Sequence, residues 1–285
     1  MNESELKKYF IKDLGWGWFR DYQSRKVFEF LVEASRFCEN GVVLDAGAGH
    51  QRYRPFFDDS LYLSQEHEDG IKFKDMKNIQ YDLLNPIDVK IPLKNDCIDG
   101  VLSTSVIEHL TRPDIFCNEA HRVLRPGGKL FINVPFSIIE HETPYDYNRP
   151  TRYALQKWLN DAGFKDIIIN PSSSCTDTVC NVLPIAVYCD ILKTNEGYQK
   201  NFVRVYRSSA NPVIKLLEYI RILVAGAAYA VTKILCGILK LLVDRGPYDK
   251  ALLPVGWIVV ASKRGKHFRS KGQPRREEFL KKYKI

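Results

Sequence analysis

A glycine-rich turn with an acidic residue follows the first strongly apolar segment of the chain. The sequence there is Val42-Val-Leu-Asp-Ala-Gly-Ala-Gly49. Gly47 and Gly49 permit a sharp turn and a close approach of the backbone to a ligand, which a Cβ atom would obstruct. Asp45 adds a negative charge two residues before the first glycine. This pattern predicts a site for a ligand that carries positive charge.

Two more acidic residues follow at positions that suit a nucleoside. Glu66 lies about 20 residues after Asp45, a spacing at which a carboxylate accepts hydrogen bonds from both ribose hydroxyls. Asp82 is the next acid of this kind, and it can hold an adenine amino group. Each residue alone is also explained by ordinary structure, as a helix cap or as an acid on a solvated turn. Their order along the chain favours the ligand site.

A dinucleotide-binding protein is the main alternative for these residues. Its fingerprint, Gly-x-Gly-x-x-Gly, requires a third glycine where this chain has Arg52. That side chain obstructs close packing of a helix on a pyrophosphate, and the charge of Asp45 repels the pyrophosphate. We therefore expect a cationic nucleoside rather than a dinucleotide.

Polar and aromatic residues gather in a later segment, 135–149. His141 is the candidate general base because the pKa of a histidine lies near neutrality, and Asp146 is the alternative. His109 is a further candidate, although packing at a helix start explains it equally well. The side chains that suit a hydroxylated ring, and hence substrate binding, are Tyr145, Tyr147 and Arg149.

Alternating strand and helix patterns position these residues. Besides the strand that begins after Gly41, apolar stretches predict strands at Leu61–Ser64, Ile98–Ser103, Lys129–Pro135, Asp166–Asn170 and Gly256–Ser262. Helices are predicted at Phe19–Phe37, Pro113–Leu124 and Thr151–Ala162, and the stretch Arg125–Gly128 is expected to stop the second of them. The fold class is therefore α/β, a doubly wound, mostly parallel, Rossmann-like sheet with a helical insertion before its last strand.

Three sequence blocks carry a family resemblance. VLDAGAGH (43–50), IDGVLSTSVIEHL (98–110) and EAHRVLRPGGKLFINVPF (119–136) resemble class I S-adenosylmethionine-dependent methyltransferases of the type 11 group, in the expected order. The resemblance implies S-adenosylmethionine as cofactor. By this resemblance, the cofactor-binding residues are Asp45, Ala46, Gly47 and Gly49 for the methionine part, Glu66 for the ribose, Asp82 and Leu83 for the adenine, and Ser103 and Ser105 along the pocket. The family's frequent third glycine is Gln51 here.

The segment PYDYNRPTRYAL (144–155) resembles members that act in bacterial surface-polysaccharide pathways. This resemblance implies O-methylation of a sugar hydroxyl in a glycan or glycolipid. A quinone-like or other small-molecule acceptor is the alternative, and a non-catalytic binding module with the same fold is the alternative from another class. A nucleic-acid methyltransferase is disfavoured because the charge of the body is balanced and Ser103-Thr-Ser-Val follows the fourth strand.

An apolar insertion interrupts the last part of the predicted domain. We divide the chain into an N-terminal helical segment (1–40), a domain (41–262) that includes the insertion (171–250), and a tail (263–285). Within 213–244 the longest uncharged run, Ile222–Thr232, is 11 residues long, too short to span a bilayer. We expect one amphipathic helix there, or two with a break near Gly226 or Gly237.

Charge is concentrated at the C-terminus. Ten Lys or Arg residues and two acids lie in the tail, whereas the rest of the chain is neutral. The insertion and the tail together leave three partners open: internal packing, a second copy of the chain, and a membrane surface. Seven cysteines occur without metal-ligand spacing, so no metal site is predicted, and without an export signal the expected setting is the cytoplasm or the inner face of its membrane.

Overall fold

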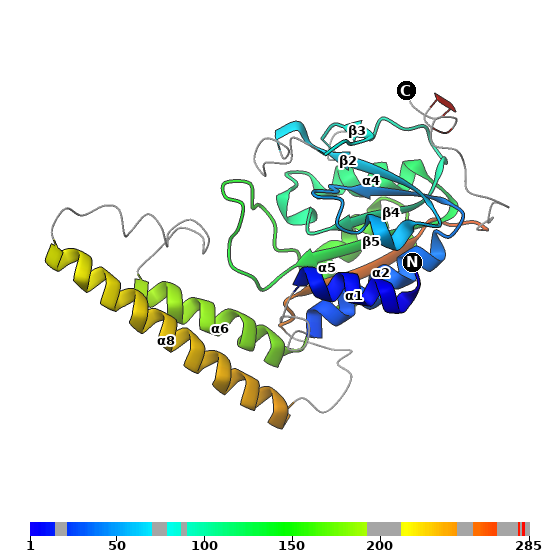
Figure 1. Cartoon of the computed structure of the whole chain (residues 1–285). Coiled ribbons are helices and arrows are strands. Elements are labelled where there is room, and N and C mark those ends of the chain that lie inside the picture. Colours follow the sequence, from blue (N-terminus) through cyan, green and yellow to red (C-terminus); the bar gives the residue numbers. More distant parts are fainter. Residues whose placement is uncertain are drawn as a thin grey trace.

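The computed structural model describes residues 1–14, 22–69, 79–86, 90–192, 212–243, 253–266, 279 and 281–282. Figure 1 shows a twisted sheet with helices packed against it, and a pair of helices, α6 and α8, that extends away from it. Most of the basic tail lies outside the described residues.

The strands are β1 (Val42–Ala46), β2 (Leu61–Glu66), β3 (Leu83–Leu84), β4 (Ile98–Thr104), β5 (Leu124–Pro135), β6 (Lys165–Pro171) and β7 (Gly256–Ser262). The α-helices are α1 (Glu3–Leu14), α2 (Tyr22–Phe37), α4 (Pro113–Val123), α5 (Arg152–Asp161), α6 (Cys175–Leu192) and α8 (Pro212–Val243). Two short 3-10 helices cover Arg54–Phe57 and Ile107–His109.

The sheet has the order β3-β2-β1-β4-β5-β7-β6. Strand β7 runs antiparallel to both of its neighbours, and the other pairings are parallel. The predicted doubly wound, mostly parallel sheet is therefore confirmed. The strand order reverses between β1 and β4, so the crevice at their carboxyl ends is where such a sheet binds its ligand.

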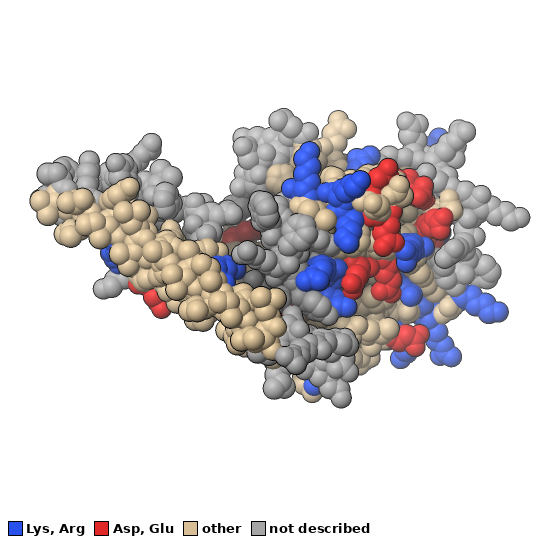
Figure 2. All heavy atoms as spheres, turned by 60° about the horizontal axis from the view of Figure 1, so that its bottom comes forward, with Lys and Arg blue, Asp and Glu red and all other residues tan. Residues whose placement is uncertain are grey.

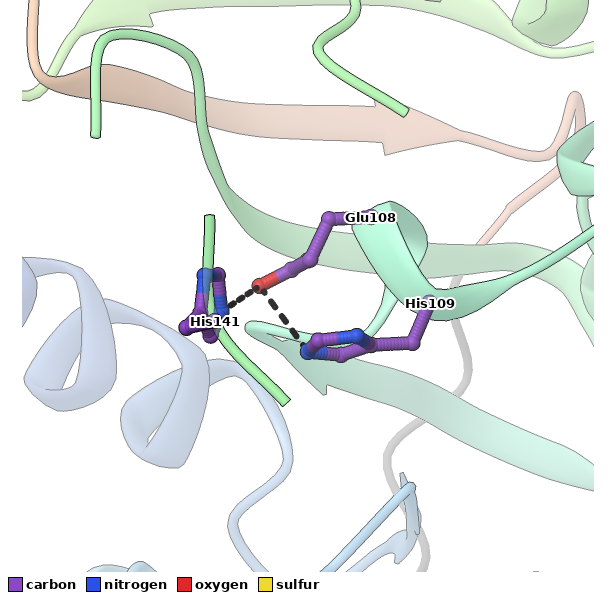
Figure 3. Close-up of side chains that lie close together, drawn as sticks. All are labelled: Glu108, His109 and His141. Atoms are coloured by element: carbon purple, nitrogen blue, oxygen red, sulfur yellow. Dashed lines mark ion pairs between the residues drawn. The ribbon is translucent and has the colours of Figure 1, made fainter. Parts of the chain in front are cut away.

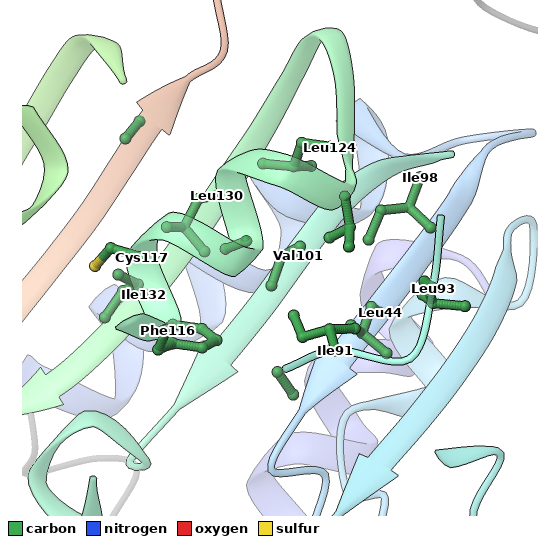
Figure 4. Packing of buried hydrophobic residues seen from close by; sticks show 14 of the residues in the cluster. Leu44, Ile91, Leu93, Ile98, Val101, Phe116, Cys117, Leu124, Leu130 and Ile132 are labelled. Atoms are coloured by element: carbon green, nitrogen blue, oxygen red, sulfur yellow. The ribbon is translucent and has the colours of Figure 1, made fainter. Parts of the chain in front are cut away.

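Strands β1 and β4 are buried along their whole length because helices cover both faces of the sheet. Leu44, Val101 and Ile132 point to one face, where they pack with Phe116 of α4 (Figure 4). Their sequence neighbours Val43, Leu102 and Phe131 point to the other face and pack against α1 and α2. This two-sided packing makes the carboxyl ends of the central strands a rigid platform.

Some local predictions differ from the structure. Helix α1 lies in the segment 1–40 that was predicted to be helical, but its bounds were not predicted, and the two-residue strand β3 carries too weak a pattern to be predicted. Helix α4 ends at Val123, so Arg125–Gly128 follows the helix end as predicted, but these residues already lie inside β5, where the pairing shifts from Ile98 opposite Leu124 to Gly100 opposite Lys129. The turn-forming residues are accommodated as a bulge, with Gly127 at a positive φ of 83°.

Helix α8 is one continuous helix of 32 residues, without a break at Gly226 or Gly237. Its segment Tyr219–Leu239 has a mean hydropathy of 2.0 over 21 residues, and it is long and apolar enough to cross a membrane by length and composition. The segment thus meets the length and composition of a spanning helix although its longest uncharged run is 11 residues, and the expectation that it does not span stays a prediction. A core helix of a water-soluble protein can have the same length and hydropathy, but such a helix is mostly buried. Only 11% of this segment is buried within the described structure.

Asp99 ties together three parts of the sheet. Its buried carboxylate accepts a hydrogen bond from the Val42 backbone N–H at 2.8 Å, and Arg125 Nη1 donates to both of its oxygens at 3.0 Å. We predict that Asp99→Ala lowers the free energy of unfolding by about 2 kcal/mol, because it leaves a buried N–H and a guanidinium without their acceptor. Urea denaturation followed by circular dichroism measures this change.

Asp114→Ala is the matched control, since it removes a carboxylate that pairs with Arg112 at an exposed position. Surface pairs of this kind contribute little to stability. An Asp99→Ala variant as stable as the Asp114→Ala variant would contradict the role of Asp99.

Candidate active site

The glycine turn after β1 has the shape that the sequence predicts. Gly47 and Gly49 both have positive φ, at 79° and 50°. A Cβ atom on Gly47 would lie 2.5 Å from a methyl group of Val106, so the turn packs directly on the segment that follows β4. The Gln65 carbonyl fixes the turn from β2 by accepting hydrogen bonds from Gly47 N at 3.0 Å and Ala48 N at 2.9 Å.

Asp45, the fourth residue of β1, is a buried carboxylate that lacks a cationic partner among the described residues. Burial raises its pKa to about 7, and the hydroxyl of Tyr62, which donates to Oδ2, only partly offsets this effect. Oδ1 has no hydrogen-bond partner in the described part of the chain. A ligand with positive charge beside this carboxylate would favour its ionised form.

Glu66 is the last residue of β2, whereas Asp82 directly precedes β3, the neighbour of β2, rather than ending a strand; both shape the backbone there. Glu66 accepts hydrogen bonds from Gly49 N at 2.8 Å and His67 N at 3.0 Å. Asp82 accepts from the backbone N–H and the hydroxyl of Ser64, at 2.8 and 3.1 Å. The carboxylates therefore stand beside the glycine turn, and their predicted contacts with ribose and adenine stay predictions.

The remaining predicted cofactor residues lie along the same edge. Ala46 and Leu83 are buried in β1 and β3, and Ser103 is buried in β4 with its hydroxyl unpartnered among the described groups. Ser105 follows β4 with a φ of 55°, and its N–H donates to the carbonyl of Asn133 at 2.8 Å. Their placement is compatible with a pocket between β1 and β4.

The loop after β5 folds back onto the short helix that contains Glu108. The backbone N–H groups of Tyr147 and Asn148 donate to the Glu108 carbonyl at 2.7 and 3.0 Å. Asp146 accepts a hydrogen bond from the His141 N–H at 3.0 Å and forms an ion pair with Arg149. These contacts bring the candidate acceptor residues to the edge of the sheet where β4 ends.

Asp146, the alternative candidate base from the sequence, is poorly suited to accept a proton in the structure. Burial alone raises its pKa, but the hydrogen bonds from Arg149 and from the His141 backbone outweigh burial and lower it overall. Asp146 and Arg149 therefore serve to hold the loop. Tyr145 and Tyr147 are about half exposed on the same loop, and their contacts with a substrate stay predictions.

His141, His109 and Glu108 form a compact cluster (Figure 3). The Nε2 atoms of His141 and His109 lie 3.7 and 3.8 Å from Glu108 Oε1, and one atom from each residue fits within a 4.8 Å span. The Glu108 side chain is completely buried, and neither carboxylate oxygen has a hydrogen-bond partner among the described residues. The nearby Glu108 carboxylate holds the pKa of His141 above its usual value despite the opposing effect of burial.

The opposite ring nitrogens of the two histidines are held by the backbone. His109 Nδ1 lies 2.7 Å from the Tyr145 carbonyl, which only accepts, so this nitrogen carries the hydrogen. His141 Nδ1 lies 3.3 Å from the Ile139 carbonyl and 3.4 Å from Asp146 Oδ2. Arg149 Nη2 is also 3.4 Å from His141 Nδ1, although Arg149 pairs mainly with Asp146. Both Nε2 atoms therefore face Glu108 Oε1, at 3.8 Å for His109 and 3.7 Å for His141.

Sequence reasoning missed Glu108 and Tyr62 as site residues. The Glu-His pair that Glu108 forms with His109 in the sequence was a usable signal. The complete burial of Glu108 and its proximity to His141, however, depend on the path of the loop after β5. Tyr62 lies in β2 opposite Val43, and its approach to Asp45 depends on strand register.

Comparisons with known proteins assign a family to the central part of the chain. Residues 44–132 match the family model "Methyltransferase domain". A ubiquinone biosynthesis O-methyltransferase from Mus musculus is 30% identical over 74 residues, which is 26% of this chain and 20% of that protein. The chain thus matches only about a fifth of the length of this relative.

Solved structures of similar fold include an S-adenosylmethionine-dependent methyltransferase from Archaeoglobus fulgidus, at 17% identity and a TM-score of 0.48, covering 87% of this chain and 97% of that one. A phosphoethanolamine N-methyltransferase from Haemonchus contortus, in complex with S-adenosylhomocysteine, matches at 14% identity and a TM-score of 0.44, covering 84% of this chain and 52% of that one.

Residues 44–132 therefore form a methyltransferase domain of the class I type, as the sequence resemblance implied. S-adenosylmethionine is the cofactor of this class. Its sulfonium and amino groups are positively charged, which fits the buried carboxylate at the end of β1.

Asp45 gives cofactor binding a specific pH dependence. Because its pKa is raised to about 7, the ionised form that a cation favours is populated only as the pH rises through 7. We predict that affinity for S-adenosylmethionine increases several-fold from pH 6 to pH 8, and that Asp45→Asn weakens binding and removes this dependence. Isothermal titration calorimetry at several pH values measures both effects.

The stability of the protein without cofactor should change with pH in the opposite direction to the affinity. A carboxyl group whose pKa is raised in the folded state contributes stability that is present below its unfolded pKa, about 4, and lost as the pH rises through 7. Asp45→Asn should therefore unfold at a higher temperature than wild type at pH 8. Asp59→Asn, at an exposed position, is the control. Equal pH profiles for wild type and Asp45→Asn would contradict this role.

Proposed function

We propose that this protein transfers the methyl group of S-adenosylmethionine to a hydroxyl oxygen of a sugar in a glycan or glycolipid. The observation that carries the proposal is the placement of two groups at one sheet edge. The anionic glycine turn of β1 packs on Val106, and the cluster around Glu108 and His141 begins two residues later. A methyl donor at the turn would face an acceptor at the cluster.

Methyl transfer of this kind is an in-line displacement. The acceptor oxygen attacks the methyl carbon, the carbon–sulfur bond breaks, and its electron pair stays on sulfur, so the enzyme mainly aligns the two partners. A hydroxyl acceptor must also lose its proton. We propose that removal of this proton depends on His141, since Asp146 is engaged by Arg149.

The acceptor class is supported by the loop after β5. Tyr145 and Tyr147 offer half-exposed aromatic rings of the kind that bind a hydroxylated ring, and the segment 144–155 carries the resemblance to polysaccharide-pathway members. A quinone-like acceptor is the second candidate, because the mouse relative is by name a ubiquinone biosynthesis O-methyltransferase. A non-catalytic binding module is disfavoured, since Asp45, the two glycines and the downstream acids are all kept.

His141→Ala tests the chemistry. We predict that it lowers turnover about 100-fold or more while leaving affinity for S-adenosylmethionine nearly unchanged. In wild type, turnover should rise with pH to a plateau above the usual histidine pKa, because the pKa of His141 is raised and the neutral imidazole is needed. The assay incubates the protein with methyl-labelled S-adenosylmethionine and an extract of its source cells, then separates organic, aqueous and macromolecular fractions.

Label in glycan or glycolipid is the expected result, and label in a small organic-soluble product would favour the quinone-like acceptor. His121→Ala is the matched control, because this histidine packs edge-on against Phe164, away from the cluster. Wild-type turnover in His141→Ala would remove His141 from the reaction, and absence of cofactor binding in wild type would refute the function.

We further propose that the α6–α8 pair places the protein on a membrane, at the cytoplasmic face. The polarity of α8 is inverted relative to a helix of a water-soluble domain. Its charged side chains within 219–239 are Arg221 and Lys233, and both lean towards α6: Arg221 Nε donates to the Ile191 carbonyl at 2.8 Å, and Lys233 Nζ lies 3.5 Å from the Cys180 carbonyl.

The outward side of α8 is apolar. In Figure 2 the protruding pair presents a nearly uninterrupted uncharged surface, whereas charged residues of both signs are interspersed over the rest of this face. Its exposed large apolar residues within 219–239 are Tyr219, Ile220, Leu223, Val224, Val231, Ile234, Leu235, Ile238 and Leu239. In lipid, polar groups are expected between helices and apolar groups on the outer surface, whereas in water the reverse arrangement is expected.

Binding to vesicles tests this proposal. We predict that the protein co-sediments with vesicles that contain anionic phospholipid, and that Leu223→Glu/Ile234→Glu reduces bound protein at least tenfold, because acidic side chains on this face oppose contact with hydrocarbon. Tyr153→Glu, at an exposed position of α5, is the control and should bind like wild type.

Analytical ultracentrifugation without vesicles separates the alternatives. A tight dimer that the double substitution dissociates, with no vesicle binding, would mean that a second copy of the chain covers this face. A monomer that stays in the supernatant would mean that the face has no membrane affinity.

A further inference from the structure

The Glu108 carboxylate is a buried anion without a hydrogen-bond donor. The side chain is fully inaccessible to solvent, and the described residues supply no donor to either oxygen. A buried carboxylate left in this condition is strongly unfavourable. The surroundings must therefore be completed by positive charge. No arginine or lysine of the described part of the chain forms an ion pair with Glu108, and the groups that approach its carboxylate are the rings of His109 and His141.

The groups closest to this carboxylate are themselves electron-pair donors. Because His109 Nδ1 is held by the Tyr145 carbonyl, its Nε2 faces Glu108 Oε1 at 3.8 Å, and this nitrogen carries the lone pair when the imidazole is neutral. His141 Nε2 faces the same oxygen at 3.7 Å. Glu142 Oε2 lies 3.9 Å from His109 Nε2 on the more open side. Two imidazole lone pairs and a carboxylate directed at one point are the donor set of a metal site.

We propose that Glu108, His109 and His141 bind a divalent transition-metal ion. Two ligands of one zinc-like ion, with bonds of about 2.1 Å, lie roughly 3.0 to 3.5 Å apart. The separations of 3.7 and 3.8 Å exceed a hydrogen bond and lie within a small side-chain adjustment of this range. The backbone carbonyls that fix the Nδ1 atoms provide the outer contacts that metal-bound histidines usually make.

The ligand types select the class of ion. Imidazole nitrogen suits zinc, copper, iron and nickel, and the carboxylate in the set also suits manganese, whereas magnesium and calcium prefer ligand sets made of oxygen atoms. Three protein ligands also leave coordination positions open. These positions are available for oxygen atoms of the acceptor, which would lie beside the cofactor at the neighbouring β1 turn.

This site deepens the proposed function, on which its catalytic part rests. An acceptor hydroxyl bound to the ion loses its proton to solvent more easily, because the ion stabilises the alkoxide. The oxygen then attacks the methyl carbon, and the carbon–sulfur electron pair stays on sulfur. His141 serves as a ligand of the ion in this arrangement. Two neighbouring oxygens on the acceptor, such as a vicinal diol, would fill two open positions at once.

The test uses the full chain after dialysis against EDTA and then into chelator-free buffer. Mn²⁺ and Zn²⁺ are titrated separately by isothermal titration calorimetry. We expect one ion bound per chain, a rise in melting temperature with the ion, and an affinity about 100-fold or more lower in Glu108→Gln. Because Glu108→Gln removes an isolated buried charge, it should fold and melt above ion-free wild type. Glu140→Gln, an exposed glutamate next to His141, is the matched control and should bind the ion like wild type.

The outcomes separate the metal site from the methyltransferase. Failure of both ions to bind wild type at millimolar concentration, or equal binding by Glu108→Gln, overturns the metal site. Full turnover by the EDTA-treated protein without added ion overturns its part in the reaction and leaves the methyltransferase intact. Metal binding without S-adenosylmethionine binding would support the site and refute the proposed function.

Discussion

Two buried carboxylates that no arginine or lysine among the described residues neutralises lie at the carboxyl edge of the sheet. Asp45 ends the run of apolar residues in β1, and Glu108 follows β4, the neighbouring strand. Burying an isolated anion opposes folding, so a protein keeps such groups where a ligand completes them. We propose that a cationic cofactor does this for Asp45 and that a metal ion does it for Glu108. Each carboxylate would then lower the stability of the empty protein and become favourable when its own ligand binds.

The rest of the fold holds these two groups in place. Apolar layers on both faces fix β1 and β4, and Asp99 ties the start of β1 to Arg125 in the β5 bulge. At the opposite end, the loop after β5 is held by the Glu108 carbonyl and by the ion pair of Asp146 with Arg149. Because the same short helix carries the Glu108 side chain, the acceptor loop and the buried anion are positioned together. A change in the loop therefore reaches the cluster directly.

The sequence was sufficient for the parts of the structure that local chemistry determines. Gly47 and Gly49 have the positive φ values that their pattern predicts, and the bounds of β7 match the predicted strand because both of its ends are sharply marked. The contact of Glu108 with His109 and His141 could not be predicted from the sequence, because it depends on how the loop 136–149 returns to the sheet. The inverted polarity of α8 was missed for a similar reason. A helical wheel gives the arc of charged residues but not which neighbour it faces, and here Arg221 and Lys233 lean towards α6.

The helical pair leaves the domain on the same edge as the candidate active site. Strand β6 ends at Pro171, which pairs with Trp257 near the start of β7. The preceding residue, Gly256, is the first of β7 and pairs with Pro135 at the end of β5. The pair is anchored there by Ser173, whose hydroxyl accepts a hydrogen bond from the Val255 N–H at 2.8 Å. The loop 136–149, which carries the candidate acceptor residues, begins immediately after Pro135. Helix α6 therefore starts at the same edge of the sheet as this loop. This topology suits an acceptor attached to a lipid: the same contact that holds the protein would bring the hydroxyl towards the methyl donor, and the reaction would not require the acceptor to leave the membrane.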